Sequence, residues 1–185
     1  MIMMIKPANY DNVKAIRNGF ERLPAGGYVC KIIDAKDTIS KNGKPMIVLL
    51  LDISNGKYKD YFREQYDRDK QYNVEAAKWR GCYYQLYDDN NLSRFKGMIE
   101  IIQDCNNGYV FDWNEKSLKY KAVGAVFRER EYLNSQGNTR TAVECWQLRE
   151  LDGIEKIEPP PKKELEQKPY SNQFGTEAYD EQVPF

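Results

Sequence analysis

The dipeptide Asn42-Gly43 constrains the fold of this chain most, because it joins two runs of apolar residues. Asn-Gly favours the tight turn of a β-hairpin, in which the central residues take positive φ angles. The run before the turn covers residues 28–33. The run after it covers residues 46–53 and is apolar enough for a strand that is buried on both faces. The sequence therefore predicts an antiparallel pair of strands.

Three more strands are predicted further along the chain. A turn at residues 54–57 leads to a third strand at residues 58–63, which completes a meander. Two later strands cover residues 118–130 and 141–151, and the loop between them, at residues 134–138, contains a glycine. The order of these segments is three strands, a connection, and a two-stranded hairpin.

The connection between the third and fourth strands is predicted to be helical, because the period of its apolar residues changes. One helix is indicated by the spacing of Val74, Ala77, Trp79 and Cys82. In a second predicted helix, the apolar residues share one face, and we expect that face to lie in the core. These residues are Leu92, Phe95, Met98, Ile99 and Ile102.

This order predicts a mainly β fold with a helical insertion, specifically an OB-fold, which is a five-stranded Greek-key barrel. Gly124 lies in the middle of the fourth strand and favours a bulge or a sharp bend there, as a closing barrel needs. We therefore expect residues 1–158 to form one barrel domain.

The composition changes at Pro159-Pro160-Pro161, and residues 159–185 contain few aliphatic side chains. Such a segment buries too little apolar surface to offset the entropy of ordering it. We expect a flexible, Pro-rich and acidic tail with three bases and five acids, which leaves 25 bases and 23 acids in the body. The body is nearly neutral, so any site for a polyanion depends on local placement of charge.

The absence of histidine from the whole chain excludes Ser-His-Asp and Cys-His catalysis and the HExxH zinc helix. No glycine-rich phosphate loop occurs, and residues 150–153 resemble the KxDG ligase motif but have Glu150 where the lysine is required. We therefore expect no enzyme activity, no catalytic residue and no cofactor.

The four cysteines, at positions 30, 82, 105 and 145, are too far apart in the sequence to suggest a zinc site. Free thiols of this kind are typical of a reducing cytosol. No export signal is visible, and no apolar run is long enough to span a bilayer. We expect a soluble cytoplasmic protein without a membrane role.

The feature that says most about function is the interleaving of aromatic and basic residues. Aromatic residues make up 13% of the chain, and many of them adjoin Lys or Arg. Single-stranded nucleic acid is held by this combination, because rings stack on bases while cations follow the phosphates. The candidate phosphate contacts are Lys57, Lys59, Arg63, Lys119, Lys121, Arg128 and Arg130. The candidate stacking residues are Tyr58, Tyr61, Phe127 and Trp146.

Strand alternation in residues 118–122 places Lys119 and Lys121 on one face and Tyr120 on the other. We therefore expect the two lysines to be exposed and Tyr120 to lie in the core.

The last residues resemble the tail tip of bacterial single-stranded DNA-binding proteins, in which acids precede an aliphatic-Pro-Phe ending. The matching residues are Asp180, Glu181, Val183, Pro184 and Phe185. In that family the tip recruits replication and repair enzymes. The resemblance implies that Phe185 enters an apolar pocket of a partner while the acids face a basic rim. Val183 and the sparse acidic run depart from the familiar pattern.

The body is similar to small phage and prophage proteins of Gram-positive bacteria that are regarded as single-stranded DNA-binding proteins. The similarity lies in turn and strand residues, at positions 23–28, 42–46, 79–82, 95–97, 107–109 and 127–132. It implies single-stranded DNA binding in the bacterial cytoplasm during phage DNA replication or recombination, with partner proteins recruited by the tip. A homo-oligomer is possible, because proteins of this type work as monomers, dimers or tetramers.

Two other interpretations fit the sequence. The body could bind protein instead of DNA, which would make the chain a protein–protein adaptor. Alternatively, carboxylates could hold Mg²⁺ for a nuclease, the candidates being Asp34, Asp37, Asp52 and Glu144. The same acids also fit turns and strand ends, which is the simpler interpretation.

Overall fold

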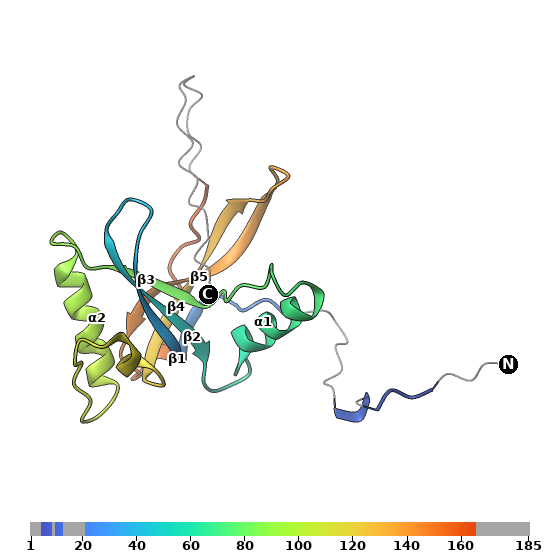
Figure 1. Ribbon diagram of the computed structural model, residues 1–185, viewed down its shortest axis with the longest axis horizontal. Coiled ribbons are helices and arrows are strands. Elements are labelled where there is room, and N and C mark those ends of the chain that lie inside the picture. The colour runs from blue at the N-terminus through green and yellow to red at the C-terminus, as the bar shows by residue number, and fades with distance from the viewer. Residues whose placement is uncertain (1–4, 9, 13–20, 166–185) are drawn as a thin grey trace, which may run out of the picture.

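A computed structural model describes residues 5–8, 10–12 and 21–165 of the chain. These residues form a five-stranded antiparallel sheet with two α-helices, in the order β3-β2-β1-β4-β5 (Figure 1). The predicted mainly β fold with helices inserted between strands is confirmed. The sheet is open, since β3 and β5 are its edges, although these two strands lie near each other.

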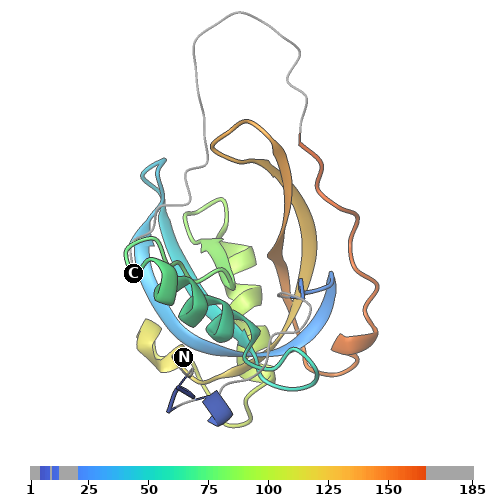
Figure 2. The same cartoon turned by 90° about the vertical axis from the view of Figure 1, so that its right-hand side faces the viewer.

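Strands β1 (Gly26–Ile39) and β2 (Pro45–Ile53) form the hairpin that Asn42-Gly43 predicts, with Gly43 at φ 73°. The pairing register of β1 shifts between Ile32 and Asp34. Its first half pairs with β4 on the opposite edge from β2. β1 is therefore the strand that links both halves of the sheet, and it curves beneath the molecule in Figure 2.

The predicted third strand at residues 58–63 is wrong, because helix α1 (Tyr61–Tyr72) begins there. Tyr61 and Phe62 are adjacent and both buried, which the first turn of a helix allows and strand alternation does not. The third strand is instead β3 (Cys82–Leu86), which pairs with β2.

The predicted helix over Val74, Ala77, Trp79 and Cys82 is also wrong, since residues 73–81 form no helix and Cys82 begins β3. Trp79 and Cys82 are apolar because both pack against the outer face of β2, on Val48 and Leu50. Their spacing imitates a helical face by coincidence.

Helix α2 (Leu92–Asp104) is confirmed, and its inner face buries the predicted core residues. These residues are Phe95, Met98, Ile99 and Ile102. Leu92 is an exception, because its side chain is half exposed at the first turn. The helix lies on the left of Figure 1 and α1 on the right, and both helices bury residues in the same core cluster.

Strands β4 (Ala122–Leu133) and β5 (Thr139–Arg149) form the predicted second hairpin. β4 begins later than expected, because Tyr120 takes φ 65° and donates its N–H to the carbonyl of Ile32. Tyr120 is exposed, so the prediction that it lies in the core is wrong.

The predicted irregularity in the fourth strand is real but misplaced. The register of β4 and β5 shifts between Val126 and Phe127, where Trp146 is the extra residue of β5. Gly124 has another function, because a Cβ there would lie 2.5 Å from the carbonyl oxygen of Glu150. The lack of a side chain lets the chain that follows β5 cross the sheet.

After β5, the short helix η3 (Ile154–Lys156) packs on β1, and residues 159–165 run along the far part of β4. The backbone of Lys163 donates to Glu129 and accepts from Glu131, both at 2.8 Å. Lys162 and the carboxylate of Glu131 form an ion pair at 2.5 Å. The first residues of the expected tail thus lie on the sheet, and residues 166–185 are outside the described part.

Candidate nucleic-acid interface

Trp79 is fixed on the outer face of β2, between α1 and β3. Its indole N–H donates to the carbonyl oxygen of Leu51 at 2.9 Å, and its ring packs against Val48 and Leu50. Gly81 makes this close approach possible, because a Cβ there would lie 2.5 Å from the same carbonyl oxygen and 2.6 Å from the ring of Phe62. The ring of Trp79 is therefore held in one orientation.

Cations and rings alternate along α1 beside this tryptophan. The guanidinium carbon of Arg63 lies 6.0 Å from the centre of the Trp79 ring, and the Tyr66 ring centre lies 5.8 Å from it. The ammonium of Lys70 lies 5.7 Å from the centre of the Tyr66 ring. We call Arg63, Tyr66, Lys70 and Trp79 the α1 ladder. Each cation faces a ring at cation–π distance.

Asp52, near the end of β2, holds the first turn of α1 in place. Its carboxylate accepts from the backbone N–H of Phe62 at 3.0 Å and from that of Arg63 at 3.3 Å. Burial raises the pKa of Asp52, and the bonds from Phe62, Ile53 and Arg63 oppose that rise. The helix would otherwise lack a cap, since Asp60 precedes it without a capping side-chain bond.

The outer face of the β4–β5 hairpin carries a second group of cations, Arg128 and Arg130, on either side of one carboxylate. A guanidinium nitrogen of Arg128 lies 2.7 Å from Glu144, and Nε of Arg130 lies 2.8 Å from its other oxygen. The guanidinium of Arg130 also lies 6.0 Å from the centre of the Tyr132 ring. We call Arg128, Arg130, Tyr132 and Glu144 the hairpin face.

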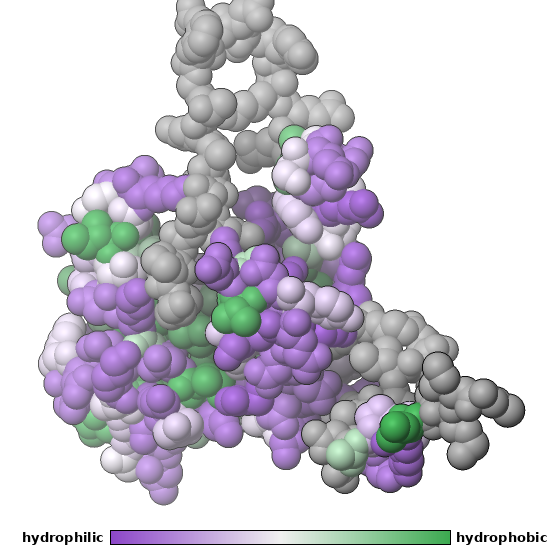
Figure 3. All heavy atoms as spheres, turned by 45° about the vertical axis from the view of Figure 1, so that its right-hand side comes forward, coloured by the Kyte–Doolittle hydropathy of each residue, from purple (hydrophilic) through white to green (hydrophobic). Residues whose placement is uncertain are grey.

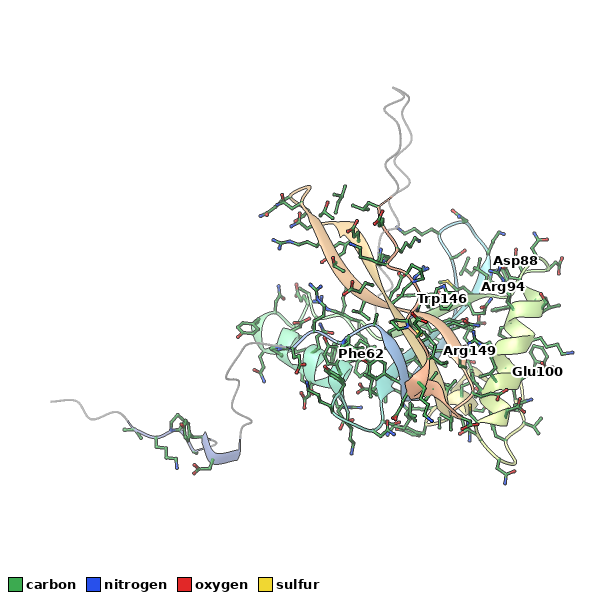
Figure 4. All side chains as sticks on the ribbon, turned by 180° about the vertical axis from the view of Figure 1, so that it is seen from behind. Phe62, Asp88, Arg94, Glu100, Trp146 and Arg149 are labelled. Atoms are coloured by element: carbon green, nitrogen blue, oxygen red, sulfur yellow. The ribbon has the colours of Figure 1, made fainter. Side chains whose placement is uncertain are left out.

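Trp146 lies on β5 at the register shift, and 43% of its surface is exposed. Bulges of this kind turn a side chain away from the regular alternation. In Figure 4, Trp146 and Arg94 of α2 are seen on the same side of the molecule. Trp146 is therefore the predicted stacking ring with the most accessible surface of those named.

Two other predicted stacking residues are buried and cannot stack on a base in this conformation. Phe127 has no exposed surface, and Tyr61 has 9%. Their rings pack together with those of Phe62, Tyr28 and Tyr58 in edge and tilted contacts. The expectation that Tyr61 and Phe127 bind bases is corrected: aromatic rings fill the core here.

The turn before α1 places Lys57 and Tyr58 against Glu21. The ammonium of Lys57 lies 2.6 Å from the Glu21 carboxylate, and the hydroxyl of Tyr58 donates to it at 2.9 Å. These hydrogen bonds raise the pKa of Lys57 and lower that of Glu21. Lys59 is exposed nearby. Glu21 thus competes with any phosphate for Lys57.

Lys119 and Lys121 lie apart from these groups, in the chain between α2 and β4. Their ammonium groups lie 5.4 Å from the centre of the Tyr120 ring and 4.3 Å from that of Tyr109. The predicted site residues therefore fall into separate groups along the sheet. The predicted tip residues, Asp180, Glu181, Val183, Pro184 and Phe185, lie outside the described residues.

In the sequence, Tyr66 and Trp79 are only two of the many aromatic residues that lie near Lys or Arg. Once a helix begins at Tyr61, Arg63, Tyr66 and Lys70 recur at i, i+3 and i+7 and share one face. That spacing was the signal for the α1 ladder, and the expected strand at residues 58–63 concealed it.

The surface drawn in Figure 3 is mainly hydrophilic, with apolar side chains in small separate groups. Among the described residues, no three His, Cys, Asp or Glu side chains are gathered so that they could hold a metal ion. No helix in the described part of the chain is both long and apolar enough to cross a membrane.

Residues 8–82 match a family model described as "Protein of unknown function (DUF669)". The matched segment includes β1, β2 and α1, ends at the first residue of β3, and covers less than half of the chain. A search of curated proteins gives no match.

Proposed function

We propose that this chain binds single-stranded DNA without strong sequence preference, through the α1 ladder and the hairpin face of an OB-type barrel. The strand order supports the OB-type assignment, because β1 pairs with both β2 and β4 while the edge strands β3 and β5 lie near each other. The position of α2 between β3 and β4 agrees with it.

The α1 ladder carries the proposal. Its tryptophan, Trp79, packs with Cys82 on the outer face of β2, which is the face that OB-folds use for oligonucleotides. Its rings offer stacking surfaces, and its cations, Arg63 and Lys70, are exposed beside them. Each stacked base contributes about 1–3 kcal/mol, so a few rings give useful affinity to a nearly neutral body.

The two hairpins flank the proposed DNA-binding face. The β1–β2 and β4–β5 hairpins project from the same side of the sheet in both Figure 1 and Figure 2. Their loops correspond to those that flank the binding face of an OB-fold. The hairpin face adds Arg128 and Arg130, which are available for phosphates when Glu144 is displaced.

The tail completes the proposal. Its tip, residues 180–185, would recruit replication or recombination enzymes of a bacterial host, in phage DNA metabolism, while the body holds DNA. Deleting residues 177–185 should leave DNA affinity unchanged or slightly higher, because acids that compete with DNA are removed. A large loss of DNA binding on this deletion would contradict the division of roles.

The test is a titration of tryptophan fluorescence with a thymine oligonucleotide at several salt concentrations, with duplex DNA as the comparison. Single-stranded DNA should quench the fluorescence, with log K falling by about 0.7 per phosphate contact for each unit of log salt. Arg63→Gln with Lys70→Gln should reduce that slope, and Lys96→Gln, at an exposed site on α2, is the matched control. An unchanged oligonucleotide anisotropy at low salt would favour the protein–protein adaptor instead.

A further inference from the structure

The loop between α2 and β4 exposes two aromatic rings on strained backbone. Trp113 has φ 63° and is 80% exposed, and Tyr120 has φ 65° and is 66% exposed. A left-handed conformation is unfavourable for a bulky residue, whereas glycine adopts it readily. The hydrogen bond from Tyr120 to Ile32 and the contacts of Trp113 with Phe95 and Phe111 offset part of that cost in the free protein. Both rings nevertheless stay largely exposed, so a ligand could cover them.

Lysines outnumber acids around these rings, since residues 112–121 contain three lysines against Asp112 and Glu115. Lys119 stands over Tyr120, and Lys121 stands over Tyr109. Lys116 anchors the loop to β1, because its ammonium donates to the carbonyl of Ala35 at 2.9 Å and to Asp34. Rings with cations beside them match bases and phosphates, whereas a purely apolar protein surface would gain nothing from the lysines.

Aromatic residues lie at intervals between the α1 ladder and this loop, before, within and after the edge strand β3. Trp79 precedes β3, Tyr84 lies within it and is 49% exposed, and Tyr87 follows it. The Tyr87 ring centre lies 5.3 Å from that of Phe95, which lies 6.4 Å from that of Trp113. The ladder and Trp113 therefore lie near opposite ends of β3, whose five residues span about 17 Å.

We propose that Trp113 and Tyr120 form a second stacking platform, which takes the same single strand of nucleic acid after it has crossed the edge of β3 from the α1 ladder. This inference rests on the proposed function. It predicts that a short oligonucleotide occupies the ladder alone, and that a longer one gains affinity from the platform.

The experiment uses the full chain and oligothymidylates of about five and about twenty nucleotides, which lie near the lower limit and above the upper limit of the site sizes of OB-folds. The variant Trp113→Gly with Tyr120→Gly removes both rings and relieves both strained φ angles. We expect its affinity for the long oligonucleotide to fall at least about tenfold and that for the short one to stay unchanged. Its melting temperature should stay the same or rise.

Tyr72→Ala is the control, because Tyr72 is an exposed ring at the end of α1, outside both the platform and the α1 ladder. If the glycine variant melts lower, Lys119→Gln with Lys121→Gln tests the platform without touching its rings. In that variant, the slope of log K against log salt should become smaller by about 1.4 for the long oligonucleotide and stay unchanged for the short one.

Unchanged binding of the long oligonucleotide by both variants, while the wild type binds both lengths, would overturn the platform and leave the proposed function standing. A wild-type chain that binds neither length would overturn both.

Discussion

The carboxylate of Asp52 accepts a hydrogen bond from the backbone N–H of Phe62 at 3.0 Å, which joins the end of β2 to the first turn of α1. Both residues are buried. Arg63 follows Phe62 and begins the α1 ladder, and its own N–H also points to Asp52. A buried carboxylate thus sets where the proposed DNA-binding helix begins.

Asp52 should make the stability of the chain depend on pH. Since burial raises its pKa above the ordinary value of 3.8, the folded chain holds this proton more tightly than the unfolded chain. The folded chain is therefore most stable while Asp52 is protonated. That stability is lost as pH rises from the pKa of Asp52 in the unfolded chain through its higher pKa in the folded chain. The side chain of Asp52→Asn stays neutral at every pH and keeps one oxygen acceptor. The unfolding free energy of the variant minus that of the wild type should therefore increase as pH rises over that range. Urea unfolding of both proteins from about pH 3 to pH 7 measures this difference, and a constant difference would contradict the assignment.

Gly27→Ala should destabilise the body strongly. A Cβ at Gly27 would lie 1.9 Å from the carbonyl oxygen of Ile154, which is backbone and cannot rotate away. We expect a loss of about 3 kcal/mol of unfolding free energy. Gly97→Ala is the control, because Gly97 lies within α2 with open space around it and should gain up to about 1 kcal/mol. Equal denaturation midpoints for the two variants would show that η3 does not pack on β1.

Glu144→Gln should strengthen binding to single-stranded DNA. Glu144 forms ion pairs with both Arg128 and Arg130, and these ion pairs must break before the two arginines can contact phosphates. Ion pairs at the surface, such as these partly buried ones, contribute up to about 1 kcal/mol, so affinity should rise up to about fivefold, with a steeper salt dependence.

Glu129→Gln removes the same charge from the same hairpin without touching those ion pairs. An equal gain in affinity for Glu129→Gln would mean that only net charge matters, and the hairpin face would lose its support.

The segment at residues 159–165 should protect the edge of β4. Lys163 pairs with the backbone of Glu129 and Glu131, in a part of β4 that extends beyond its pairing with β1. A chain that ends at residue 158 leaves this edge open, and open edges pair with other chains. We expect it to self-associate more than a chain ending at residue 165.

Sedimentation of both truncated chains over a range of concentrations measures the difference. Identical association would show that the segment does not shield the edge.

The sequence by itself determined the elements whose signals are local. Asn42-Gly43 marks the first hairpin, and Gly137 lies in the turn of the second. The inner face of α2 follows from spacing within one helix. In these cases the residues that carry the signal are the same ones that make the contacts, so composition and period suffice.

Only the tertiary structure decided the region between β2 and β3. Tyr61 and Phe62 form a helix because Asp52 caps it and Phe127 packs on it, and these partners belong to two other elements, β2 and β4. Alternation can separate two faces of a strand, but it does not tell which face another element covers.

The same reason explains which rings are exposed. Phe127 and Tyr120 both adjoin basic residues, yet Phe127 is buried in the core and Tyr120 faces solvent. Tyr120 is turned outward by a positive φ that a long-range hydrogen bond to Ile32 maintains. The aromatic and basic composition could suggest a nucleic-acid site, but only the packing of distant segments decides which rings are accessible to bind one.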